Sequence, residues 1–152
     1  MSKSVIAFMN HLGNGIDPHE CWESGGFFPN KVNSNIEDLC VWACERFFSW
    51  CWSSQLFETV SMEPGRLLPE ALEGLRVLGC THTAGVTNSV ISELGDDFPR
   101  NDLARKRLCE SIEESKWRSV YKLLYLAWEK DNYETKVDRY AHHYCKRIGL
   151  SS

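Results

Sequence analysis

The feature that most constrains the fold is a long helical pattern of apolar residues that begins just after residue 35. Apolar side chains occur at positions 36, 39, 40, 43, 47, 50 and 51, a spacing that places them on one face of a helix. Ser34 and Glu37 form a capping-box pattern at its start. We therefore predict a helix over residues 35–59. Because Trp42, Phe48 and Trp52 add apolar surface outside this face, we expect the helix to be central and covered on most sides.

Most of the remaining chain shows the same periodicity, interrupted by Gly and Pro. Further helices are predicted over residues 4–12, 67–78, 86–98, 102–114, 116–130 and 133–148. The segment from Val120 to Trp128 is densely apolar and is expected to be buried. No strand patterns separated by turn residues are present. The sequence thus predicts an all-α fold: a compact single domain over residues 1–152, a bundle of six or seven helices, with a turn-rich loop over residues 13–34 and a frayed C-terminus.

Composition and charge exclude several classes of partner. Asp and Glu outnumber Lys and Arg by 21 to 17, which gives a net charge of −4 and no global positive field to attract nucleic acid. No run approaches the roughly eighteen apolar residues that a membrane span needs, and no secretory signal pattern begins the chain. The seven cysteines are an odd number, which fits a reducing compartment. We expect a cytoplasmic protein, and a nuclear location is equally compatible with these features.

Metal-binding and catalytic patterns are weak. Cys80, His82, His142 and Cys145 offer ligand types that zinc accepts, but their spacing matches no known zinc finger. A small zinc-binding module therefore stays only as an alternative, and the cysteines are more simply core thiols. No Gly-x-Ser-x-Gly elbow and no glycine-rich phosphate loop is present. The sequence does not predict an enzyme or a cofactor.

Residues 91–98, Ile-Ser-Glu-Leu-Gly-Asp-Asp-Phe, carry the most legible functional pattern. On a helix, Thr87, Ile91, Leu94 and Phe98 would share one face, with Gly95 and Asp96 beside them. This octapeptide resembles the third homology motif of the Bcl family of apoptosis regulators. In that family the motif helix presents apolar anchors, a small residue and an acidic residue to a groove. The resemblance extends over about residues 86–130, where Trp117 precedes the apolar segment that would be the buried central helix of a Bcl-like fold.

This resemblance implies a soluble apoptosis regulator that binds the amphipathic death-motif helix of a pro-apoptotic protein in an apolar groove, or donates its own. The resemblance also implies that Arg118 forms an ion pair with a carboxylate of the bound death-motif helix. The implied partner-binding residues are Ile91, Leu94, Gly95, Asp96, Phe98, Trp117, Arg118, Val120 and Leu124.

The residues also support an alternative outside the Bcl family. In this alternative the protein is a helical adaptor that docks another protein through an aromatic surface built from Trp42, Trp50 and Trp52. If a pathogen encodes it, the docked protein would be one of its host. Exposed thiols and many aromatic residues also leave a homodimer open.

Overall fold

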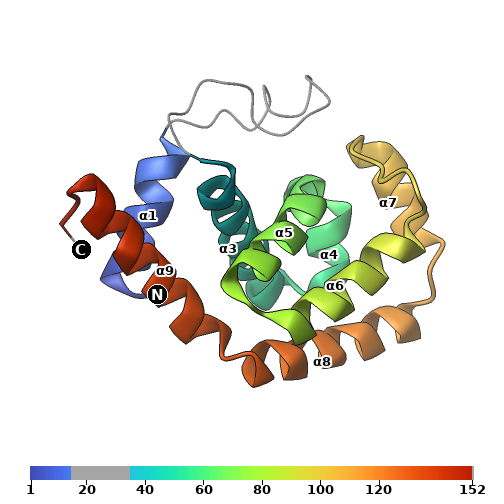
Figure 1. Ribbon diagram of the computed structural model, residues 1–152. Coiled ribbons are helices and arrows are strands. Elements are labelled where there is room, and N and C mark those ends of the chain that lie inside the picture. Colours follow the sequence, from blue (N-terminus) through green and yellow to red (C-terminus); the bar gives the residue numbers. More distant parts are fainter. Residues whose placement is uncertain (15–34, 152) are drawn as a thin grey trace.

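The computed structural model describes residues 1–14 and 35–151 and contains only helices in those ranges (Figure 1). The predicted all-α fold is therefore confirmed there, while most of the predicted loop over residues 13–34 lies outside the described residues. The described ranges contain eight α-helices and one short 3-10 helix. They are α1 (Lys3–Gly13), α3 (Ile36–Ser54), α4 (Leu56–Ser61), η1 (Glu63–Leu67), α5 (Leu68–Leu78), α6 (Thr81–Glu93), α7 (Asp102–Glu110), α8 (Glu114–Lys130) and α9 (Tyr133–Ile148).

Helix α3 is the central element, as its pattern predicted. Its side chains are buried around most of its circumference, including Trp42, Phe47 and Phe48. Its most extensive contact is with α5, where Gly74 brings the two backbones together. A methyl group on Gly74 would lie only 2.3 Å from the carbonyl oxygen of Cys40. The backbones of α3 and α5 thus lie in close contact in the core.

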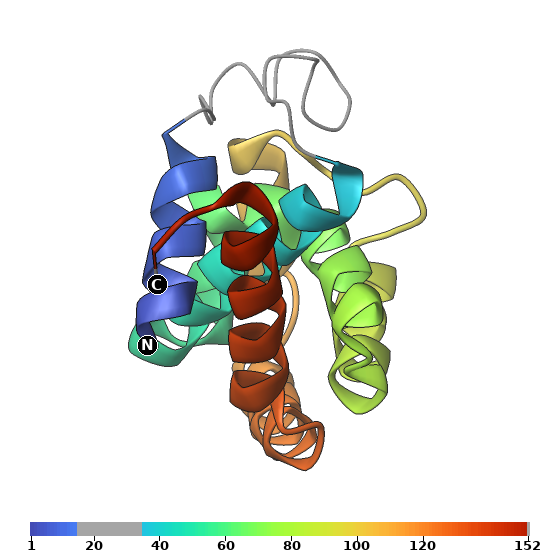
Figure 2. The same ribbon diagram turned by 60° about the vertical axis from the view of Figure 1, so that its left-hand side comes forward.

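The other helices surround this pair in two groups. Helices α1 and α9 pack against each other on one side, and Figure 2 shows them next to one another. Helix α6 packs against both α5 and α8, and α8 runs below α6 in Figure 1. The buried apolar residues of all these helices form one continuous core. None of the helices in the described ranges is both long and apolar enough to cross a membrane.

The predicted boundaries of the central helix were partly wrong. The helix begins after Asn35, whose side chain accepts a hydrogen bond from the Asp38 amide at 2.9 Å, while Ser34 lies outside the described residues. It ends at Ser54 rather than near Thr59, because Gln55 adopts a φ of 83° and starts the separate helix α4. A non-glycine residue in this left-handed region is uncommon. This break turns α4 toward α7 and α8.

The prediction that Val120 to Trp128 is a buried central helix was also wrong. Within that segment only Leu124 and Ala127 are buried, whereas Leu123 and Leu126 are 56% and 62% exposed. Helix α8 therefore lies on the surface and buries one face against α6 and α4. The central helix of this fold is α3.

Candidate partner-binding cleft

The octapeptide at residues 91–98 does not form one helical face. Helix α6 ends at Glu93, Leu94 caps it, and Gly95 turns the chain with a φ of 101°. Leu94 is buried in the core, Ile91 and Phe98 are partly buried against it, and Asp96 is exposed. The predicted alignment of four anchors on one helix is therefore wrong from residue 94 onward. The physical reason is the positive φ at Gly95, which stops the helix before Asp96 and Phe98.

The other predicted site residues lie on α8, and the structure places them in different surroundings. Leu124 is almost fully buried, at 1% exposure. Trp117 and Val120 line a small apolar pocket of about 70 Å³ between α6 and α8, together with Val90 and Ile112. Arg118 lies on the other side of α8 and lines a larger cleft. Trp117 lines both hollows, so it is the predicted residue that the structure places most centrally.

That larger cleft, here called the α4/α8 cleft, has a volume of about 690 Å³ and lies between α4, the α7–α8 connection and α8. Its apolar lining comprises Leu56, Phe57, Ile112, Trp117 and Tyr121. Its remaining lining residues are Gln55, Glu58, Glu110, Glu113, Glu114 and Arg118. An apolar hollow with a polar rim is the usual form of a ligand or peptide site.

The floor of the α4/α8 cleft is held by direct contacts. The indole Nε1 of Trp117 donates a hydrogen bond to the Cys109 carbonyl oxygen at 3.0 Å. The Phe57 and Trp117 rings meet edge to face with centroids 5.7 Å apart. Leu56 is 2% exposed and anchors α4 in the core. Because each ring is fixed by a neighbour on another element, the floor is formed in the absence of a partner.

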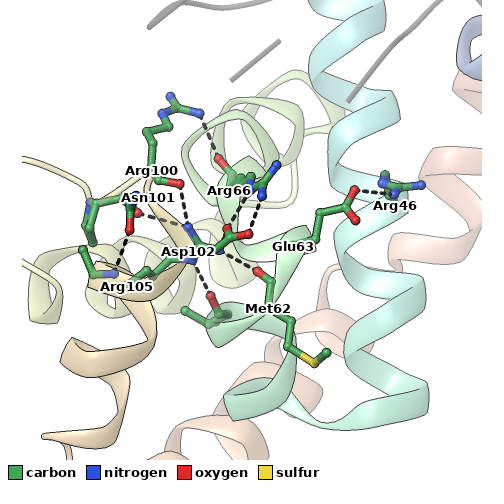
Figure 3. Close-up of polar contacts among 11 residues, drawn as sticks. Arg46, Met62, Glu63, Arg66, Arg100, Asn101, Asp102 and Arg105 are labelled. Carbon is green, nitrogen blue, oxygen red and sulfur yellow. Dashed lines mark hydrogen bonds and ion pairs between the residues drawn. The ribbon is translucent and has the colours of Figure 1, made fainter. Parts of the chain in front are cut away.

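A buried arginine positions the wall that α7 contributes. Arg105 is completely buried, and its guanidinium donates to the carbonyl oxygens of Val60 and Met62, both at 2.6 Å. It also donates to Asp102, which in turn accepts from Arg66 (Figure 3). The Arg66 hydrogen bond and the two arginine charges hold the pKa of Asp102 below its usual range. This network fixes α7, which contributes Glu110 to the cleft, against the end of α4.

The rim of the α4/α8 cleft is acidic. Four glutamates line it, with one arginine. That arginine, Arg118, already lies 3.5 Å from Glu114, and both side chains are largely exposed. Glu110 lies 4.0 Å from Lys106 at the limit of an ion pair. The electrostatic field at the cleft mouth therefore favours positive charge.

Sequence reasoning missed most of the residues of this cleft. Leu56, Phe57 and Glu58 were assigned to the central helix, and residues 110–114 to the end of the helix predicted over residues 102–114. The available signal was the single apolar residue Ile112 within the acidic run Glu110, Glu113 and Glu114. Nothing in the sequence showed that this run would face α4, because the contact depends on the break at Gln55.

The alternative sites do not assemble among the residues that the structure describes. No group of three or more His, Cys, Asp or Glu residues there is arranged to hold a metal ion, so Cys80, His82, His142 and Cys145 are not brought together. The six cysteines in these ranges are free and buried. Burial raises the pKa of the Cys80 thiol to about 11. The exposed thiols that favoured a homodimer are therefore absent from this part of the chain.

The predicted aromatic docking surface was wrong as a set. Trp42 is 5% exposed and donates from its Nε1 to the Met9 carbonyl oxygen, whereas Trp50 is 41% exposed. Trp52 is partly buried among the rings of Phe48, Tyr121 and Trp128. These three tryptophans share α3, but the helix turns them toward different neighbours, so they do not form one exposed face.

Comparison of the chain with protein-family models, with curated proteins and with solved structures gave no match.

Proposed function

We propose that this protein is a binding module that holds an amphipathic helix of a partner protein in the α4/α8 cleft. The observation that supports this most strongly is the combination of a fixed apolar floor with a rim of four glutamates. Apolar side chains on one helix face would enter the hollow beside Phe57 and Trp117. Lysine or arginine side chains flanking that face would pair with the rim.

The narrower form of this proposal is that the bound helix is the death-motif helix of a pro-apoptotic protein. It is supported by the resemblance of residues 91–98 to the Bcl family motif and by the place of Arg118 on the cleft wall. A death-motif carboxylate would have to displace Glu114 from Arg118. The acidic rim favours the general form, in which the partner helix is basic, over this narrower one.

Two labelled peptides with the same apolar anchors test the general form. One carries lysines beside the anchors, and in the other each lysine is replaced by glutamate. We expect the lysine peptide to bind roughly tenfold more tightly at low salt, and to lose that advantage as salt screens the rim. Equal binding of the two peptides would contradict the proposal.

Variants of the rim provide the matched control. Replacing Glu113 and Glu114 together by Lys reverses exposed charge at the cleft and should remove the preference for the lysine peptide. The same reversal at Asp96 and Asp97, which are exposed in the loop after α6, should leave the preference unchanged. Fluorescence anisotropy measures each affinity. If both double variants behave alike, the effect comes from net charge and not from the cleft.

A death-motif peptide tests the narrower form. We expect it to bind with a dissociation constant below about 100 μM and to bind less tightly after Arg118→Glu. Weaker binding than this, or binding that Arg118→Glu does not change, would exclude the death-motif helix while leaving the basic helix as the occupant.

A further inference from the structure

A second cavity, separate from the α4/α8 cleft, lies where α1, α3, α8 and α9 meet. Its volume is about 460 Å³, within the range of small-molecule sites. Its aromatic lining residues are Phe48, Trp52, Trp128 and Tyr133, and Met1, Val5 and Val137 add aliphatic surface. Its titratable groups, besides Tyr133, are the carboxylates of Glu45, Glu134 and Asp138 and the amino group of Met1, and no Lys, Arg or His side chain lies among its lining residues. The cavity therefore combines aromatic rings with carboxylates.

The aromatic wall is one connected cluster. The ring centroids of Trp128 lie 5.2 Å from those of Trp52 and 5.1 Å from those of Tyr133. Phe48 joins the cluster through Trp52 at 5.8 Å and Tyr133 at 5.7 Å. The faces of such rings attract cations, and groups of them form the known binding sites for quaternary ammonium ions.

Glu45 is the unusual member of this lining. It is 8% exposed, and its carboxylate accepts a hydrogen bond from the Tyr133 hydroxyl at 2.7 Å. It has no ion pair with a side chain in the described ranges, although a buried carboxylate without a counterion is costly. Burial raises its pKa, whereas the Tyr133 hydrogen bond and the positive charge of the Met1 amino group lower it. Positive charge placed near Glu45 is therefore stabilising.

We propose that this cavity binds a small organic cation, an amine or a quaternary ammonium ion, with its charge beside Glu45 and its alkyl groups against the aromatic wall. Glu134 and Asp138 are exposed at the cavity and add to its negative potential. The cation would form with Glu45 an ion pair, which the Met1 amino group does not form, and contact with the rings would remove its alkyl groups from water. This site is independent of the partner-binding cleft, with which it shares no lining residue.

Three probes of similar size test the proposal on the intact protein: butylammonium, tetramethylammonium and neutral 1-butanol. Binding is followed by tryptophan fluorescence and by the NMR signals of the indole N–H groups of Trp52 and Trp128. We expect saturable binding of at least one cation, with 1-butanol at least about tenfold weaker. The stronger of the two cations identifies the class of amine. Failure of both cations to saturate, or equal binding of 1-butanol, would overturn the proposal.

Two variants assign the binding to Glu45 and its neighbours. Glu45→Gln keeps the shape and the contact with Tyr133 but removes the charge, so cation binding should fall at least about tenfold. Glu134→Gln removes the charge of an exposed residue in the first turn of α9, and should cause a smaller loss. Glu113→Gln removes the same charge at the α4/α8 cleft and should leave cation binding unchanged. Unchanged binding in the first two variants would also overturn the proposal.

Discussion

At the scale of single residues, Arg105 joins several elements through the hydrogen bonds of one buried side chain. Its three nitrogens donate to the oxygens of Val60, Met62, Pro99, Arg100 and Asp102. Lysine has three donors on one atom and cannot reach such a spread of acceptors. We expect Arg105→Lys to lower the free energy of unfolding by about 2–4 kcal/mol, because buried carbonyl oxygens lose their partners. Denaturant unfolding followed by circular dichroism measures the change.

The matched control for Arg105 is Arg76→Lys. Arg76 pairs with Glu73 on the surface, and both side chains are 53% exposed. Exposed ion pairs contribute little, so this variant should remain within about 0.5 kcal/mol of the wild type. Similar losses in the two variants would mean that the buried network around Arg105 is not what stabilises the junction of α4 and α7.

Glu45 gives a stability effect that depends on pH. Because burial raises its pKa in the folded state, the folded protein binds the proton more tightly than the unfolded chain does. The resulting stabilisation is fully present below the ordinary glutamate pKa of about 4.3 and is lost as pH rises through the raised value. Tyr133, the Met1 amino group, Glu134 and Asp138 are the titratable groups around it in the cavity.

Glu45→Gln removes this titration while keeping a side chain of the same shape. We therefore expect the variant to be more stable than the wild type at about pH 8, with the difference shrinking toward about pH 4. Each unit of pKa shift corresponds to about 1.4 kcal/mol. Unfolding curves measured across this pH range test the expectation. A stability difference that does not vary with pH would contradict it.

At the scale of elements, the sequence was sufficient to predict that the fold is helical and that α3 is its centre. It was not sufficient to predict where α3 ends, because Gln55 carries no turn signal and its φ of 83° arises in the packed fold. The many apolar residues of α8 also led to the wrong prediction that this helix is buried, whereas Leu123 and Leu126 are exposed. Periodicity records which residues share a face, but not which face the rest of the molecule covers.

The same limit explains why the candidate cleft was not predicted. Trp117 and Arg118 were singled out from a family resemblance, and both do line the α4/α8 cleft. Phe57 and Glu58 face them across more than fifty residues of sequence, brought there by the turn after α3 and by the Arg105 network. A site assembled from such distant segments has no local signature in a single sequence.

The α3–α5 contact supports a sharp prediction about two glycines. Alanine at Gly74 would place its Cβ 2.3 Å from the Cys40 carbonyl oxygen and 2.7 Å from the Cys44 Cβ, so the helices would have to move apart. We expect Gly74→Ala to lower the free energy of unfolding by about 2 kcal/mol or more. Gly85 lies inside α6 with open space around it. There the better helix propensity of alanine should raise stability by about 0.5–1 kcal/mol.

Thermal and denaturant unfolding of the two glycine variants, measured side by side, tests the packing. Both changes add one methyl group within a helix, so they differ only in what surrounds it. Opposite signs are expected. Stabilisation by Gly74→Ala would show that α3 and α5 do not approach as closely as the core described here requires.

At the scale of the whole molecule, the reactivity of the buried cysteines can report whether the fold opens as one cooperative unit. The six in the described residues are buried and lie on three helices and one connection. Burial raises the pKa of Cys40 and Cys51 to about 12, and that of Cys109 to about 11. Because the thiolate is the reactive form, such thiols are protected twice, by lack of access and by lack of ionisation.

We therefore expect alkylation of these six thiols at about pH 8 to follow opening of the whole fold rather than local motion. The test uses a Cys21→Ser variant, so that only cysteines in the described residues react. Their modification by iodoacetamide, resolved by peptide mass spectrometry, should share one rate constant in the absence of denaturant, because five of them belong to a single core and Cys40 is also buried. Above the unfolding midpoint all six should react rapidly. Early modification of Cys109 alone would instead show that α7 opens independently, and with it the wall of the α4/α8 cleft.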